Sequence, residues 1–89
     1  MTDEELAKIE SRCESARSGP WRSFVEGRDH TSGCSFIKVG EGEIRSDDIE
    51  LTGATVADQD FIASARQDVP ALVSEVRRLR KLLSASSEN

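Results

Sequence analysis

The chain has 89 residues, a formal net charge of −5, 36% hydrophobic residues and 33% charged residues. This length supports one small domain, which buries only roughly 60–65% of the surface of its unfolded chain and is modestly stable unless it oligomerises. Its longest apolar run is far shorter than the roughly 20 residues of a membrane-spanning helix. Its first residues are acidic and lack the apolar core of a signal peptide. We therefore expect a cytoplasmic protein, and the net charge argues against general binding to nucleic acid.

The first predicted element is an amphipathic helix over about residues 3–17. Thr2 and Glu5 have the spacing of a capping box, in which each side chain accepts a hydrogen bond from the other residue's backbone N–H. Residues that follow at steps of three, four and three share one apolar face: Leu6, Ile9, Cys13 and Ala16. Gly19-Pro20 ends this helix, because proline cannot continue it and glycine supplies a permissive cap.

The middle of the chain favours a small antiparallel β-meander of three to four strands. Residues 21–25 and 34–39 form two aromatic and β-branched segments, and the second alternates between two faces. The polar stretch 27–33 between them is bounded by glycines, which is typical of a hairpin loop. Trp21, the only tryptophan, has two interpretations: a core residue that pins the first helix to the sheet, or an exposed interface anchor.

A second turn at residues 40–42 leads into one interrupted strand or two short strands within residues 43–52. Three apolar side chains of this segment are expected to point inward: Ile44, Ile49 and Leu51. The pair Asp47-Asp48 is typical of a bend, a sheet edge or a β-bulge.

Two helices are predicted to close the fold. Thr55 or Asp58 caps the first of them, which ends near residues 66–67, and Asp68 caps the second, with Pro70 in its first turn. This last helix runs to about Leu83. The sequence therefore predicts one α+β domain over residues 1–84, with both closing helices packed on one face of the sheet, and a polar tail over residues 85–89.

The last predicted helix carries the clearest pattern in the chain. Its apolar residues recur at steps of three, four, three and four, as in a short coiled-coil seam: Val69, Leu72, Val76, Leu79 and Leu83. Either the domain itself covers this stripe, or its C-terminal part projects to pair with another chain. The candidate partner-binding residues are Val76, Leu79, Leu82 and Leu83, flanked by Arg77 and Arg80.

The same helix carries a basic cluster formed by Arg77, Arg78, Arg80 and Lys81. Cations near a helix C-terminus complement the helix macrodipole, which is the simpler explanation. The alternative is a phosphate-binding patch, and it would make the protein a regulator that binds nucleic acid.

Nucleophile, base and carboxylate side chains gather at one place, the predicted hairpin loop. Arg28, Asp29 and His30 are followed there by Ser32 and Cys34. A hydrolytic or small-molecule site would need a turn that brings the imidazole to a nucleophile. The simpler interpretation is a solvated hairpin tip in which Asp29 and Ser32 cap the turn.

The sequence indicates no metal centre and no cofactor. One histidine and two separated cysteines cannot build a zinc site, and Cys13 and Cys34 have no redox spacing. We expect both cysteines to be free thiols in a cytoplasmic setting. No catalytic residues are predicted.

Two segments carry a family resemblance. Ser18-Gly19-Pro20-Trp21, and a closing stretch containing Phe61-Ile62-Ala63, Pro70-Ala71-Leu72 and Glu75-Val76, are similar to a group of small bacterial and prophage proteins that includes the Ead-like phage early proteins. Ser18 replaces the first proline of the family's Pro-Gly-Pro-Trp turn. The resemblance covers about half of the chain and implies an architecture of helix, variable β region and closing helices, with no activity attached.

Together these patterns predict a non-enzymatic accessory protein that contacts a protein partner, or itself as a weak homo-oligomer, through its last helix. The two alternatives are the nucleic-acid-binding regulator and the ligand or hydrolytic site at the hairpin loop.

Overall fold

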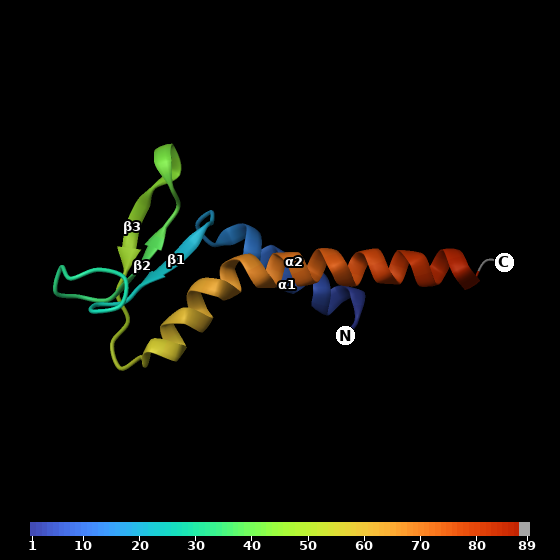
Figure 1. The fold of residues 1–89 in the computed structure, drawn as a ribbon. Helices are drawn as coiled ribbons and strands as arrows, with labels where there is room; N and C mark the ends of the chain where they lie inside the picture. Colours follow the sequence, from blue (N-terminus) through green and yellow to red (C-terminus); the bar gives the residue numbers. More distant parts are fainter. Residues whose placement is uncertain (88–89) are drawn as a thin grey trace.

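The computed structural model describes residues 1–87 and confirms the predicted α+β class. Figure 1 shows a small sheet at one end of the molecule and a long helix that extends away from it, with a shorter helix alongside. The radius of gyration is 17.0 Å, against about 12 Å for a compact domain of this length. The protein is therefore elongated. Within the described residues no helix is both long and apolar enough to cross a membrane.

The first helix, α1, spans Asp3–Ser15 and begins with the predicted capping box. The Glu5 N–H donates to Thr2 Oγ1 over 3.1 Å, and the Thr2 N–H donates to Glu5 Oε1 over 3.0 Å. The hydrogen bond from the Thr2 N–H, and to a lesser extent one from the Thr2 side chain, stabilise the ionised carboxylate and lower the pKa of Glu5. Leu6 is 1% exposed and anchors α1 to the long helix.

The predicted meander is confirmed with three antiparallel strands in the order β1-β2-β3. They are β1 (Trp21–Phe24), β2 (Phe36–Val39) and β3 (Ser46–Ile49). Trp21 pairs with Val39 at one end of the β1–β2 hairpin, and Phe24 pairs with Phe36 at the other. The register shifts between β2 and β3 at Asp47-Asp48, which confirms the predicted irregularity.

One predicted part of the sheet is wrong. Residues Gly42–Ile44 form a short 3-10 helix, η1, and the Ile44 side chain is 56% exposed. The physical reason is the pair Gly40 and Gly42, whose φ angles of 73° and 60° turn the backbone back on itself before β3 begins.

The two predicted closing helices are one continuous helix, α2 (Val56–Ser87). It begins where predicted, because Thr55 and Asp58 form a reciprocal cap in which each side chain accepts the other's N–H at 3.0 Å. The expected break before Pro70 is absent. Pro70 lies inside the helix, and Figure 1 shows α2 bending between its sheet-packed segment and the segment beside α1.

Tertiary contacts on both sides of Pro70 explain why the helix continues. Before it, Gln59 and Ala63 are buried against the sheet; after it, Val73 is buried beside α1. One uninterrupted helix satisfies both contacts, and packing of that kind offsets the roughly 3 kcal/mol that an internal proline costs. Residues 85–87 of the predicted tail are helical as well, and residues 88–89 lie outside the described part.

The core is small and divided between two layers. Between the sheet and α2 lie Val25, Ile37, Val39 and Ala63. Between α1 and α2 lie Leu6 and Val73. Beyond these contacts, α1 is the one element of the described part, residues 1–87, that lies beside the C-terminal part of α2, so one side of this helix is uncovered (Figure 1).

Candidate functional site

The continuity of α2 lengthens the apolar stripe predicted for its C-terminal part. The steps of three and four extend back by two positions and give seven residues, here called the open seam: Ile62, Ala65, Val69, Leu72, Val76, Leu79 and Leu83. α1 covers one flank only. Leu72 remains 61% exposed and Leu83 71% exposed, and Phe61 beside the seam is 74% exposed.

The structure separates the six predicted partner-binding residues into two groups. Leu79, Leu82 and Leu83 are exposed, at 46%, 54% and 71%, in the part of α2 that projects from the domain. The others face α1: Val76 is half-buried there, Arg77 donates to Glu10 over 3.1 Å, and Arg80 pairs with Asp3. The arginines therefore hold the two helices together.

Sequence reasoning included Val69 in the stripe but missed the part of this surface that precedes it, Ile62 and Ala65. Ile62, Ala65 and Val69 line a shallow groove together with Ile9 of α1, its C-cap Ala16, and Trp21. This feature, here called the Trp21 groove, has a volume of about 320 Å³. Trp21 is half-buried, and its Nε1–H donates to the Arg17 carbonyl over 3.2 Å. It is thus neither a fully buried core residue nor a free anchor.

A second apolar groove continues the first along α1 and α2. It has a volume of about 170 Å³, and its lining shares Ile9 and Val69 with the Trp21 groove and then reaches Leu72 and Val76. The two grooves and the exposed leucines therefore form one apolar face along α2 from Ile62 to Leu83.

The basic cluster fits neither of its predicted roles well. Three of its four cations contact carboxylates: Arg77 with Glu10, Arg78 with Glu75, and Arg80 with Asp3. The contact with Arg78 lowers the pKa of Glu75. The macrodipole explanation also weakens, because α2 runs to Ser87 and its last turn holds no basic residue. Intramolecular pairing explains most of this cluster.

The predicted ligand loop is fastened to the start of α2. Arg28 donates to both oxygens of Asp60, over 2.8 and 3.0 Å, and to Asp29 over 2.9 Å. Asp29 also accepts the Val25 N–H over 2.8 Å, so it caps the turn as predicted. Arg28, and to a lesser extent Ser23, lower the pKa of Asp60 to about 2, and the pKa of Asp29 is lowered by Arg28 and by the Val25 N–H.

The rings of Phe24 and Phe36 stack on each other, with centroids 5.4 Å apart, and His30 packs beside this pair, with its centroid 6.3 Å from Phe24 and 5.2 Å from Phe36. Its Nδ1 is 2.5 Å from Ser32 Oγ, but its Nε2 is buried and has no hydrogen-bond partner within residues 1–87. A catalytic base needs a polar group that orients its second ring nitrogen, and Asp29 is committed to Arg28 instead. This arrangement favours the hairpin-tip interpretation over a nucleophilic site.

We expect acid to destabilise the protein through the Arg28–Asp60 pair. The pKa of Asp60 is about 2 in the folded chain and 3.8 in its ordinary state, so the pair's stabilisation is complete above about pH 4 and is lost as the pH falls toward 2. Asp60→Asn should flatten this part of the curve of unfolding free energy against pH, measured by urea unfolding from pH 2 to 6. Asp47→Asn, at an exposed position with no ion pair within residues 1–87, is the control and should leave the curve unchanged. An unaltered curve in Asp60→Asn would contradict the assignment.

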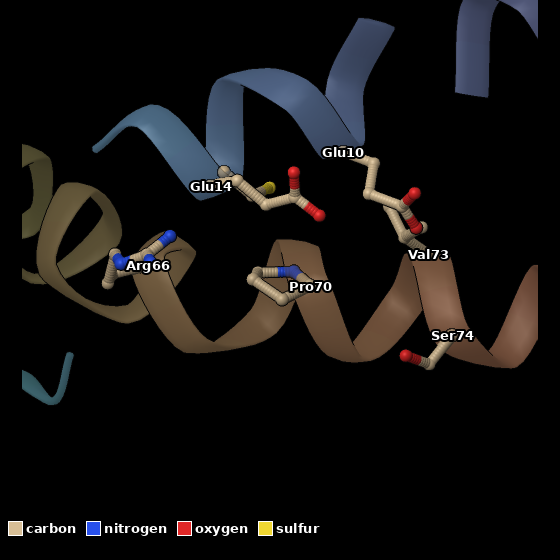
Figure 2. Close-up of a pocket in the computed structure, with 7 residues that line it drawn as sticks. Glu10, Glu14, Arg66, Pro70, Val73 and Ser74 are labelled. Carbon is tan, nitrogen blue, oxygen red and sulfur yellow. The ribbon is translucent and has the colours of Figure 1, made fainter. Parts of the chain in front are cut away.

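Between α1 and α2, on the side away from the open seam, lies a depression of about 200 Å³. Figure 2 shows Glu10 and Glu14 on α1 above Arg66, Pro70, Val73 and Ser74 on α2. It is smaller than the roughly 300–1,000 Å³ of typical ligand pockets. Within residues 1–87 no three His, Cys, Asp or Glu side chains gather closely enough to hold a metal ion.

The apolar face of α2 is therefore the strongest candidate for a binding surface, because it leaves large apolar side chains exposed to water. No protein-family model, curated protein or solved structure matches this chain, so the resemblance to the Ead-like phage early proteins stays a prediction.

Proposed function

We propose that this chain is a non-enzymatic interaction protein of the cytoplasm, which binds a protein chain through the open seam of α2. The observation that carries the proposal is the exposure of Leu72, Leu79 and Leu83 in one unbroken helical stripe. Large contiguous apolar faces on small proteins mark interaction sites, because their burial removes ordered water at a gain of roughly 25 cal/mol per Å².

The nucleic-acid alternative has weaker support. A phosphate-binding surface needs cations that are free to replace counterions, and Arg77, Arg78 and Arg80 already contact carboxylates. The hairpin-loop alternative is also weaker, since Arg28 and Asp29 hold the loop to α2 and to the backbone.

The test replaces Leu79 and Leu83 together by lysine. Both side chains are exposed and lysine is a good helix former, so circular dichroism should show an intact fold. We expect a loss of at least tenfold in self-association, measured by sedimentation, or in capture of a partner from an extract of the native cell. The lysines would place desolvated charges in the contact.

Ser74→Lys is the matched control, because it adds a lysine to the exposed side of α2 that faces away from the seam. It should leave both measurements unchanged. Association and capture that survive in the folded Leu79→Lys, Leu83→Lys variant would refute the proposed function.

A further inference from the structure

The two ends of the open seam differ in shape. At the sheet end, Ala65 and Val69 form the floor of the Trp21 groove. At the other end, Leu79 and Leu83 project from the C-terminal part of α2, where α1 is the one neighbouring element within residues 1–87. One chain therefore carries the Trp21 groove at one end of the seam and, at the other end of the same helix, leucine side chains of a kind that fits such a groove.

We propose that the seam is covered by a second copy of this chain, with the two α2 helices antiparallel; this inference rests on the function proposed above. A two-fold axis on the seam side of α2, at the level of residue 74 along the helix, sets Leu83 of one copy against Ala65 of the other, and Leu79 against Val69. Leu72 then meets Val76 next to the axis. Each copy fills the Trp21 groove of the other, which is the reciprocity that an isologous dimer requires.

The charges of α2 distinguish an antiparallel from a parallel pair. Its first half carries Asp58, Asp60, Arg66 and Asp68, a net −2, and its second half carries Glu75 with four cations, a net +3. Antiparallel helices place the two halves side by side with opposite signs, whereas parallel helices place like charges together. Most of these charges are already paired within the chain, but Asp68 and Lys81 form no ion pair within residues 1–87. In the antiparallel pair, Asp68 of one copy lies opposite residue 80 of the other and therefore next to its Lys81.

The available area is sufficient for a dimer of moderate affinity. The exposed apolar side chains of this face are Phe61, Ile62, Leu72, Leu79, Leu82 and Leu83. Their exposed fractions correspond to roughly 500 Å² per chain, at the upper end of what monomers leave uncovered. Two such faces give about 1,000 Å², the size at which specific interfaces begin.

Sedimentation equilibrium and site-directed crosslinking test the proposal on the full chain. We expect a monomer–dimer equilibrium. The dimer dissociation constant should rise at least tenfold in Leu83→Lys, which changes the projecting side, and also in Ala65→Lys, which changes the groove. A monomer at concentrations up to several hundred micromolar would overturn the inference.

Crosslinking decides the orientation. In a Cys13→Ala, Cys34→Ala background, mild oxidation of a mixture of Ala65→Cys and Leu83→Cys chains should give the mixed disulfide, identified by mass spectrometry. Leu83→Cys alone should give little dimer, because antiparallel packing separates the two positions by about 27 Å, or 18 residues at 1.5 Å per residue. Efficient crosslinking of Leu83→Cys to itself would indicate parallel helices and overturn the proposal.

The two proposals fail in different ways. If the chain is monomeric but loses a captured partner on replacement of Leu79 and Leu83, the seam binds a different protein and only the dimer is refuted. If neither dimerisation nor capture responds to these replacements, the proposed function fails as well.

Discussion

Gly40→Ala should lower the free energy of unfolding by about 3 kcal/mol or more, the largest effect we expect from a single methyl group in this chain. Gly40 has a φ of 73°, and an added Cβ would lie 2.3 Å from the Ile44 carbonyl oxygen and 2.9 Å from its carbon. Both are backbone atoms, so no side-chain rotation relieves the overlap. The Gly40 N–H also donates to the Pro20 carbonyl over 2.9 Å, so a shift here disturbs the start of β1.

Gly42→Ala is the control, measured with Gly40→Ala by urea unfolding followed by circular dichroism. Gly42 has a similar φ of 60°, but an added Cβ would meet nothing within 4 Å. It should therefore cost about 1 kcal/mol, the price of the left-handed conformation alone. Equal losses in the two variants would show that the close approach to Ile44 contributes nothing.

Local signals explain which elements were predictable from the sequence. The helix starts at Thr2 and Thr55 depend on residues three positions away, and both reciprocal caps form. The β1–β2 hairpin was predictable because the polar stretch 27–33, with a glycine at each end, separates two apolar segments. Asp68 followed by Pro70 is also a strong local signal for a helix start, but the break that it predicts does not occur. Contacts with the sheet and with α1 keep α2 helical through Pro70.

The same error limited the prediction of the candidate site. Leu79 and Leu83 stood out because their spacing is helical within one predicted element. Ile62 and Ala65 belong to the same seam, but an expected break between residues 66 and 68 hid their register. Trp21 is distant in sequence, and only the antiparallel packing of α1 on α2 brings it to the groove. Periodicity finds a face within one element, whereas a groove between elements depends on their packing.

The contact between α2 and the sheet was the least predictable part. Gln59 is 5% exposed, and its amide nitrogen lies within hydrogen-bond distance of Ser23 Oγ at 2.9 Å and of the Phe24 and Phe36 carbonyls at 3.2 Å. Gln67, two turns later, bonds to the N–H and carbonyl of Trp21 over 2.7 and 3.2 Å. Glutamine on a helix is usually solvent-exposed, so no sequence pattern marks either residue.

We expect Gln59→Met to lower the free energy of unfolding by about 2–4 kcal/mol. Methionine keeps the length of the side chain and the helix propensity, so the change removes the amide and little else. The acceptors on β1 and β2 lose a donor in a place that water does not reach, and the penalty for such groups exceeds the gain from burying a thioether. Urea unfolding monitored by Trp21 fluorescence provides the measurement.

Gln67→Met tests whether the stabilisation by these glutamines depends on the burial of their hydrogen bonds or only on the number of bonds. Gln67 makes as many contacts as Gln59, including one to the Ala63 carbonyl over 3.1 Å, but its side chain is exposed. Water can replace its amide, so this variant should cost at most about 1 kcal/mol. If the two variants lose the same free energy, the number of hydrogen bonds, and not their burial, holds α2 to the sheet. The larger loss at Gln59 would instead identify that residue as the polar anchor that holds the start of the long helix to the sheet.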